Sequence, residues 1–329
     1  MSHEGELEMM AHAAAVGRTA RSTARPNPWV GAVVVDERGT LVASGATEPP
    51  GERHAEVVAL DAAGAASRGA TLYVTLEPCA HTGRTPPCTE RIVAAGVARV
   101  VVAVLDPDVR VRGRGVARLR DAGVLVDVGA GAEEVGADLA PYLHHRTTGR
   151  PYVVLKWAAT LDGRTAAPDA SSRWVTSEAA RHDAQRLRAD SDAVLVGAGT
   201  VRADDPRLTV RLGEVERQPL RVVLGEAPQG ARVHPCLEYR GELGAVLDDL
   251  GARGVLQLLV EGGARVAHDF VAQGLVDRYV AYVAPAILGG DDGAPVLFGP
   301  GAPTMAAVWR GRFVSVARVG EDLRVEVEP

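Results

Sequence analysis

The residues most able to do chemistry lie between residues 54 and 88. His54 and Glu56 belong to a His-Ala-Glu run, and Cys79 and Cys88 each follow a proline further along the chain. One imidazole and two thiolates are typical zinc ligands, and three protein ligands leave a fourth tetrahedral position for water, as in catalytic zinc sites. The pattern therefore predicts one Zn²⁺ per chain, held by His54, Cys79 and Cys88. Glu56 is predicted to act as a general acid and base without binding the metal.

Each of these residues alone has an ordinary structural explanation, since a single Cys is usually a small packed hydrophobe. Their combination is harder to explain in that way, because the chain has only three Cys and two of them belong to this cluster. We expect Cys236, the third, to be a packed thiol. A zinc-stabilised binding module without turnover is an alternative, but a purely structural site has no use for the carboxylate of Glu56.

The spacing of the two cysteines separates classes of zinc deaminase. Eight residues lie between Cys79 and Cys88, whereas nucleoside, tRNA and polynucleotide deaminases usually have two. The run EPCAHTGRTPPC, which ends at Cys88, closely resembles the bifunctional riboflavin biosynthesis family, a diaminohydroxyphosphoribosylaminopyrimidine deaminase fused to a 5-amino-6-(5-phosphoribosylamino)uracil reductase. A pyrimidine nucleotide or tRNA deaminase with an unrelated C-terminal domain is the second enzyme hypothesis, and the spacing counts against it.

Three polar residues near this cluster are candidates for substrate contacts. Asn27 lies in a proline-containing loop before a strand, and His81 and Arg84 lie in the loop between the two cysteines. By residue type alone, Asn27 is a turn residue and the other two are solvated loop residues. The resemblance implies instead that all three contact the pyrimidine ribose phosphate.

Motifs of the second half extend the resemblance to almost the whole chain. They are KWAATLDGRT from residue 156, WVTS from residue 174, ADDPRLT from residue 203 and VEGG from residue 260. They look like the reductase half of the family, which has a dihydrofolate-reductase-like fold and uses NADPH. By resemblance, the cofactor site is lined by Ala158, Trp174, Thr200, Asp204, Gly263, Ala264, Arg265, Val266, Ala267, His268 and Asp269. The substrate site is lined by Ser172, Arg188, Leu208, Arg211 and Glu261, and Lys156 and Asp204 are candidate catalytic residues.

Glycine turns in this half bear on the cofactor. GAGTVR at 197–202 follows an apolar strand but has Arg202 where the Rossmann pattern requires its third glycine, so it supports no dinucleotide fingerprint. EGGA at 261–264 lies between a strand and a helix, where backbone N–H groups could hold a phosphate, and a plain tight turn explains it equally well. Many members of the family have Asp-Ser where this chain has Gly225-Glu226. Glu226 would repel the 2′-phosphate of NADPH. The resemblance therefore predicts the preference for NADPH over NADH less firmly than it predicts the fold.

The hydrophobic periodicity predicts alternating helices and strands around these residues. In the first half we expect helices over 1–16, 54–66, 89–95, 115–122 and 133–145 and strands over 31–36, 41–44, 71–76, 97–105 and 124–128. In the second half we expect helices over 178–190, 244–250 and 264–273, strands over 152–158, 193–196, 221–224, 255–260 and 279–284, and a hairpin over 313–328. The fold class is therefore α/β. The resemblance implies a three-layer cytidine-deaminase-like zinc domain over residues 1–146 and a dihydrofolate-reductase-like domain over residues 147–329.

Composition limits the partners and the compartment. The chain has 329 residues, 47% of them hydrophobic, and a formal net charge of −6, which argues against a nucleic-acid-binding surface. Its apolar runs are far shorter than the ~20 residues that cross a bilayer, and its acidic N-terminus is unlike a secretory signal. Three Cys, two of them assigned to metal, suggest a reducing compartment. We expect a cytoplasmic homo-oligomer that binds a small pyrimidine ribose phosphate, and neither nucleic acid nor membrane.

Overall fold

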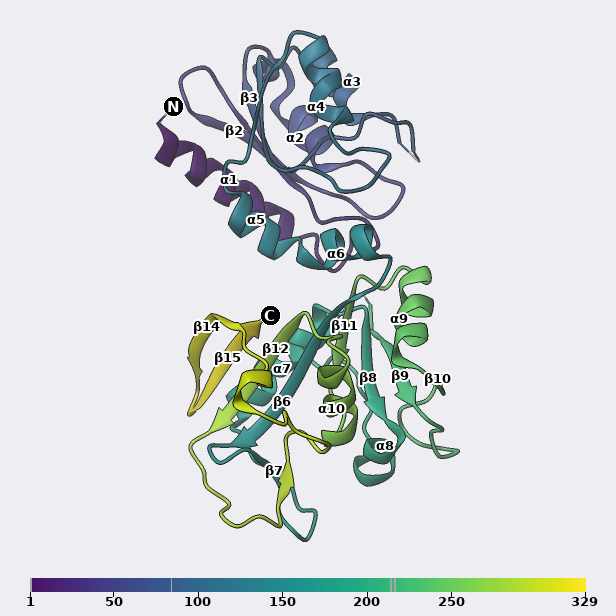
Figure 1. Cartoon of the computed structure of the whole chain (residues 1–329). Helices are drawn as coiled ribbons and strands as arrows, with labels where there is room; N and C mark the ends of the chain where they lie inside the picture. Colours follow the sequence, from purple (N-terminus) through teal and green to yellow (C-terminus); the bar gives the residue numbers. More distant parts are fainter. Residues whose placement is uncertain (1, 84, 214, 216) are drawn as a thin grey trace. The chain divides into compact units, whose positions relative to one another are not determined.

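The computed structural model describes residues 2–83, 85–213, 215 and 217–329. The chain divides into two compact units, Met1–Gly149 and Arg150–Pro329. Both units are mixed α/β structures, as the sequence predicts, and they are described here one at a time (Figure 1). Within the described residues, no helix combines the length and the apolar character that crossing a membrane requires.

A five-stranded sheet in the order β2-β1-β3-β4-β5 forms the centre of the first unit (Figure 1). β1 (Gly31–Val35) pairs antiparallel with β2 (Leu41–Ala46) and with β3 (Thr71–Leu76), and β3, β4 (Arg99–Val104) and β5 (Leu125–Val128) run parallel. β1, β3 and β4 are almost entirely buried. A strand that is covered by helices on both faces has a continuous run of apolar residues in its sequence. For this reason, the strand bounds predicted from the sequence lie close to the observed ones.

Helices cover both faces of this sheet and place the candidate zinc ligands. α1 (His3–Arg18) and α5 (Ala132–Asp138) pack together on one face, α2 (Ala55–Ala63), α3 (Cys88–Ala95) and α4 (Arg114–Asp121) lie on the other, and α6 (Ala140–Thr148) ends the unit (Figure 1). The helix expected over 54–66 is α2 followed by a short 3₁₀ turn, η1 (Gly64–Ser67). His54 is the N-cap of α2 and Cys88 is the first residue of α3, so both lie at helix N-termini.

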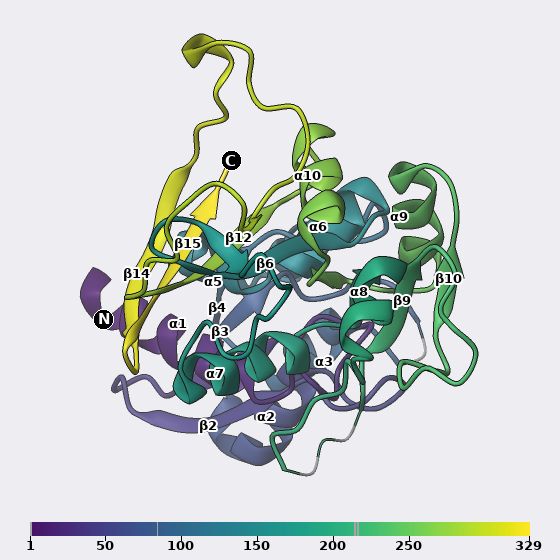
Figure 2. The same ribbon diagram turned by 90° about the horizontal axis from the view of Figure 1, so that it is seen from below.

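An eight-stranded sheet in the order β10-β9-β8-β11-β6-β12-β15-β14 forms the centre of the second unit. The six strands from β10 to β12 are parallel, and the hairpin of β14 and β15 is added antiparallel at one end. Consequently, β10 and β14 are the two edge strands, at opposite ends of the sheet (Figure 2). The strands are β6 (Tyr152–Thr160), β8 (Ala193–Gly197), β9 (Leu220–Leu224), β10 (Leu237–Tyr239), β11 (Gln257–Val260), β12 (Arg278–Ala284), β14 (Arg312–Val319) and β15 (Asp322–Glu328).

The helices of the second unit are α7 (Glu178–Ala189), α8 (Ala198–Asp204), α9 (Leu243–Ala252) and α10 (Ala264–Ala272), with a 3₁₀ turn, η2 (Met305–Ala307). A core of buried side chains, among them Leu195, Leu258 and Phe270, joins the central strands to α9 and α10. The Ser177 hydroxyl caps α7 by accepting a hydrogen bond from the backbone N–H of Ala180.

Besides the turn η2, four short elements of this unit were not predicted from the sequence. α8 contains Gly199, which disfavours a helix, and β10 has only three residues. β7 (Arg164–Ala166) and β13 (Ala294–Pro295) form a separate two-stranded sheet. None of the four has enough residues to establish a hydrophobic period, so only tertiary contacts specify them.

Candidate active sites

The first unit brings the three predicted zinc ligands together. Nδ1 of His54 lies 3.2 Å from Sγ of Cys88 and 3.7 Å from Sγ of Cys79. The three ligand atoms lie within 4.8 Å of one another. In a tetrahedral zinc site with bonds of about 2.3 Å to sulfur and 2.0–2.1 Å to nitrogen, nitrogen and sulfur are separated by about 3.5 Å. The donor set and its spacing therefore fit zinc.

The surroundings of this cluster stabilise one of its two sulfurs, that of Cys79, as a thiolate. The backbone N–H of Cys88 donates to Sγ of Cys79 at 3.3 Å. Hydrogen bonding from the Cys88 thiol, and then from His54, lowers the pKa of Cys79 to about 4. The other ring nitrogen of His54, Nε2, lies 3.5 Å from the Thr85 hydroxyl, so Nδ1 is the atom that faces the sulfurs. Such outer contacts orient a metal-binding imidazole.

Glu56 lies beside the cluster but is not part of it. It belongs to the first turn of α2, and only 3% of the residue is exposed. Burial raises the pKa of its carboxyl, and the positive charge of His54 opposes that rise. Burial favours the protonated form of a carboxyl, so Glu56 can hold the proton that a general acid and base must carry.

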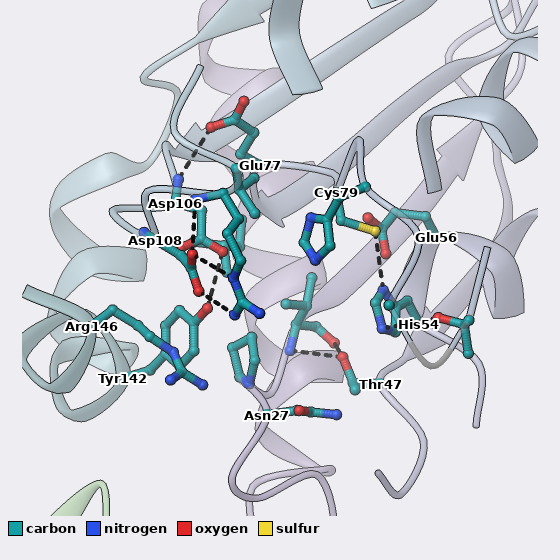
Figure 3. A pocket seen from close by; sticks show the side chains of 18 of the residues that line it. Asn27, Thr47, His54, Glu56, Glu77, Cys79, Asp106, Asp108, Tyr142 and Arg146 are labelled. Carbon is teal, nitrogen blue, oxygen red and sulfur yellow. Dashed lines mark hydrogen bonds and ion pairs between the residues drawn. The ribbon is translucent and has the colours of Figure 1, made fainter. Parts of the chain in front are cut away.

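A cavity of about 230 Å³ opens next to these residues. Its lining includes His54, Glu56 and Cys79, together with the predicted substrate residues Asn27 and His81. In Figure 3, Asn27 and Thr47 line the middle of the cavity between the ligand cluster and a polar group on the far side. Nδ1 of His81 is buried and has no hydrogen-bond partner among the described residues. Arg84, the third predicted substrate residue, lies outside the described residues.

The far side of the cavity holds polar residues that sequence reasoning missed. Arg110 forms a bidentate ion pair with Asp108, with N···O distances of 3.0 and 2.7 Å. The Tyr142 hydroxyl donates to Asp106 at 3.0 Å. The Arg146 guanidinium lies over the ring of Tyr142, 5.0 Å from its centroid. Asp106, Asp108, Tyr142 and Arg146 stand opposite the ligand cluster in Figure 3, so the cavity has a metal end and a charged end.

Glu77 supports the floor of this cavity. Its buried carboxylate accepts hydrogen bonds from the backbone N–H groups of Asp106, Gly113, Gly115 and Val116, at 2.9–3.3 Å. A Cβ on Gly115 would lie 2.0 Å from the carbonyl oxygen of Pro78, so the close packing of this loop against the Cys79 segment needs glycine there. Glu77 thereby fixes the loop that carries Asp106, Asp108 and Arg110, which are part of the charged end of the cavity.

In the second unit, a cluster of charged side chains joins α7 to the end of β11. Arg188 donates to both carboxylate oxygens of Glu261 at 2.7 Å and also to the carbonyl of Thr209. Burial would raise the pKa of Glu261, but the positive charges of Arg188, Lys156 and Arg211 hold it at about 2. Burial lowers the pKa of Lys156. Three cations around one carboxylate give the cluster a net positive charge.

The two glycine turns meet at the carboxyl end of the parallel strands. The backbone N–H of Gly263 donates to the Thr200 hydroxyl at 3.2 Å and so links the start of α10 to α8. A Cβ on Gly262 or on Gly197 would lie within 3 Å of the Val266 side chain, so both turns need glycine for close packing. Ligands of open α/β sheets bind at this edge. Of the remaining predicted cofactor residues, Ala264, Arg265, Ala267, His268 and Asp269 lie on α10, and Ala158 lies on β6.

Other predicted reductase residues occupy separate positions. Ser172 and Trp174 line a cavity of about 160 Å³ beside β7. Trp174 is 68% exposed, with the Arg181 guanidinium 4.2 Å from its ring centroid. Leu208 is buried with a positive φ of 52°, one residue before Thr209. Within the described part of the chain, no hydrogen bond, ion pair or ring contact joins Ser172 or Trp174 to the Arg188 cluster.

The two adjacent acids at the end of α8 have different surroundings. Asp205 has a positive φ of 41°, and its carboxylate accepts a hydrogen bond from the backbone N–H of Arg232 at 2.7 Å. Asp204 is exposed, and among the described residues its carboxylate has no hydrogen-bond or ion-pair partner. One carboxylate is therefore used in the fold, and the other is free for a ligand.

Glu226, at the expected departure from the family, is paired with a cation. Its carboxylate accepts a hydrogen bond from Arg240 at 2.6 Å, and both side chains are largely exposed. An exposed pair of this kind contributes little to stability. It does offset the negative charge that we expected to repel the 2′-phosphate of NADPH.

Comparison with known proteins matches both units. A model of the cytidine and deoxycytidylate deaminase zinc-binding region matches residues 4–104, and a model of the RibD C-terminal domain matches residues 151–325. The riboflavin biosynthesis protein RibD of Mycobacterium tuberculosis is 46% identical over 92% of this chain and 91% of its own. The structure of Acinetobacter baumannii RibD, form 1, has a TM-score of 0.93 at 36% identity, covering 100% of this chain and 99% of that one. A Thermotoga maritima structure, described as a diaminohydroxyphosphoribosylaminopyrimidine deaminase/5-amino-6-(5-phosphoribosylamino)uracil reductase, has a TM-score of 0.90 at 32% identity, covering 99% of each chain.

Proposed function

Because this chain belongs to the RibD family of riboflavin biosynthesis proteins, we propose an assignment of its two activities to the side chains described above. The protein is a bifunctional enzyme. Its zinc-dependent deaminase hydrolyses the amino group of 2,5-diamino-6-(ribosylamino)pyrimidin-4-one 5′-phosphate. Its NADPH-dependent reductase, which has a dihydrofolate-reductase-like fold, then reduces the ribosyl side chain to give 5-amino-6-(ribitylamino)uracil 5′-phosphate. We assign the first reaction to residues 1–146 and the second to residues 147–329.

One observation carries the deaminase assignment: a buried acid, Glu56, stands beside a His-Cys-Cys cluster at one end of a cavity. His54, Cys79 and Cys88 would hold the zinc ion. Bound zinc supplies a Lewis acid that activates water for hydrolysis. Glu56 takes the proton of the attacking water and passes it to the departing ammonia. Asn27 and His81 orient the pyrimidine ring, and Arg84 contacts the ribose phosphate.

The charged end of the cavity fits the substrate's phosphate. Arg146 lines the cavity and makes no ion pair with any residue that the structure describes. By contrast, the Arg110 guanidinium is already paired with Asp108. Asp106 and Asp108 are near enough to interact electrostatically with Arg146, but a guanidinium that forms no salt bridge with a carboxylate can still bind a phosphate with two hydrogen bonds. We therefore assign Arg146 to the phosphate of the deaminase substrate.

Replacing Arg146 with Gln is expected to raise the KM of deamination about 10- to 100-fold with kcat nearly unchanged, because a hydrogen bond to a charged group contributes about 1.5–3 kcal/mol. Steady-state ammonia release would measure both constants. Arg112→Gln, which removes an exposed arginine outside the cavity lining, is the matched control. The dephosphorylated substrate should not distinguish Arg146→Gln from the unchanged enzyme, and an equal loss with that substrate would contradict the assignment.

The reductase site combines the carboxyl-edge turns with the charged cluster. Bound NADPH supplies the hydride that reduces the ribose C1′. We place the cofactor along Ala158, Trp174, Thr200, Asp204 and residues 263–269. Arg188, Arg211, Glu261, Ser172 and Leu208 would bind the substrate, and the positive charge around Glu261 supports a phosphate contact there. Lys156 and Asp204 would act at the reacting sugar.

Mass analysis of the products tests whether the protein carries out both reactions. The diaminopyrimidinone substrate should lose ammonia without NADPH, and its product should gain two hydrogens when NADPH is present. A nucleotide or tRNA deaminase with an unrelated second domain would give no reduction, and a zinc-stabilised binding module would give neither product.

We further propose that the enzyme is a cytoplasmic homo-oligomer, in which two copies associate through β14. This edge strand of eight residues carries Phe313 and Val316, which are 72% and 59% exposed. A long apolar edge strand presents unpaired N–H and C=O groups to another chain. The three cysteines form no disulfide, which agrees with a reducing compartment and supports the cytoplasmic location.

The double substitution Phe313→Glu with Val316→Lys is expected to dissociate the oligomer, because it places charges on both sides of the pairing strand. Light scattering after size-exclusion chromatography would measure the mass. Leu125→Lys, on the exposed edge strand β5 of the first unit, is the control and should leave the mass unchanged. The proposal fails if the unchanged protein is monomeric, or if the double variant keeps the oligomeric mass.

A further inference from the structure

A second group of metal-ligand side chains lies where the chain enters the edge strand β10. His234, Cys236 and Glu238 alternate along the sequence, and their ligand atoms lie within 4.8 Å of one another. The peptide bond between His234 and Pro235 is cis, and the chain bends there just before β10 begins at Leu237. Our expectation that Cys236 is a packed thiol is wrong, because this residue is only partly buried and faces His234. The deaminase and reductase sites use none of these residues.

The surrounding loop orients the imidazole for metal binding. Nε2 of His234 lies 3.1 Å from the carbonyl oxygen of Pro228, so this nitrogen carries the proton and donates it. The lone pair of Nδ1 is then free, and Nδ1 lies 3.5 Å from Sγ of Cys236. A histidine that donates its second N–H to a backbone carbonyl is the usual arrangement of a metal ligand, because this contact fixes the tautomer and the ring orientation.

The same loop also orients the carboxylate. Oε1 of Glu238 accepts a hydrogen bond from the backbone N–H of Ala227 at 3.2 Å. The second oxygen, Oε2, is not used in that contact and can bind a cation. Ala227 and Pro228 are adjacent, so one turn of the chain orients the side chains of both His234 and Glu238.

The spacing agrees with a tetrahedral transition-metal site. A nitrogen and a sulfur bound to one zinc ion are separated by about 3.5 Å. Nδ1 of His234 and Sγ of Cys236 are 3.5 Å apart, and the corresponding distances at the deaminase cluster are 3.2 and 3.7 Å. One nitrogen, one sulfur and one carboxylate oxygen suit a borderline ion such as Zn²⁺ better than Mg²⁺ or Ca²⁺, which prefer oxygen ligands.

We propose that His234, Cys236 and Glu238 form a second zinc site, separate from the deaminase metal, with water in its fourth position. All three ligands come from a five-residue run at the edge of the sheet. The ion would attach the connection between β9 and β10 to the strand that follows it. Its role is therefore to stabilise this edge of the reductase unit, and neither reaction depends on it.

Zinc counting on the full-length protein tests this site. The protein is stripped with a chelator, dialysed against micromolar Zn²⁺ and measured by mass spectrometry of the metal. The unchanged chain should bind two ions, and Cys236→Ser and His234→Gln should each bind one. Cys79→Ser should keep only the second ion, and Cys79→Ser combined with Cys236→Ser should bind none. His12→Gln removes an exposed histidine elsewhere and should still bind two.

Two further measurements test whether a variant loses zinc because its ligand is gone or because the protein no longer folds. Cys236→Ser and His234→Gln should release ammonia and oxidise NADPH at the unchanged rates, which also shows that both variants fold. With Co²⁺ in place of Zn²⁺, part of the sulfur-to-metal absorption band should disappear in Cys236→Ser. The proposal is overturned if the unchanged chain binds one ion, or if Cys236→Ser and His234→Gln still bind two.

Discussion

Glu56→Gln is expected to reduce ammonia release by about 10²- to 10⁴-fold, the usual contribution of a general acid and base, while zinc content stays unchanged. Gln keeps the size of Glu56 and the packing around this buried position, but it can neither accept the proton of water nor deliver it to ammonia. The three ligands are untouched, so the metal has no reason to leave. Parallel measurements of zinc content and of ammonia release would test this result.

A second carboxylate in the same cavity provides the control for Glu56. Glu52 also lines the cavity, but it is exposed and lies outside the ligand cluster. Glu52→Gln should therefore deaminate at nearly the unchanged rate. Glu56→Gln should also still reduce the deaminated pyrimidine, because that reaction belongs to the other unit. Loss of zinc in step with activity, or equal loss of both activities, would refute the role of Glu56.

The sequence predicted the metal end of the deaminase cavity because its residues are close together in the chain. His54 and Glu56 lie in one helix start, and Cys79 and Cys88 bracket a single loop, so residue type and spacing were informative without a structure. The charged end was missed for the opposite reason. Tyr142 and Arg146 lie on α6, far along the chain from Asp106, and no local pattern reveals that the fold brings them together.

The reductase unit shows the same limit. Long apolar strands such as β8 and β11 could be located because burial on both faces leaves a continuous hydrophobic signal. The pairing of Arg188 with Glu261 joins residues 73 positions apart, and only the family resemblance suggested that both belong to one site. Likewise, the geometry around Cys236 depends on a loop carbonyl and a backbone N–H, which the sequence cannot place.

Asp204→Asn is expected to slow reduction of the deaminated substrate by about 10²- to 10⁴-fold and to leave ammonia release and thermal stability unchanged. Asp204 ends α8, at the carboxyl side of the parallel strands where such sheets bind ligands. Its exposed carboxylate has no partner within the described residues, so the substitution removes no hydrogen bond or ion pair of the fold. In the reaction, this carboxylate would orient the ribose hydroxyls or handle the proton as the sugar ring opens.

The neighbouring acid supplies a control with the opposite expectation. The Asp205 carboxylate accepts a hydrogen bond from the backbone N–H of Arg232, and its backbone is left-handed, a conformation that Asn also tolerates. Asp205→Asn should therefore lower stability by about 0.5–2 kcal/mol, as the loss of a capping carboxylate does, and leave hydride transfer largely intact. NADPH oxidation and thermal melting of the two variants, measured side by side, separate the two roles. If Asp204→Asn is destabilised but remains active, Asp204 is a structural residue and the reductase proton chemistry belongs elsewhere, with Lys156 the next candidate.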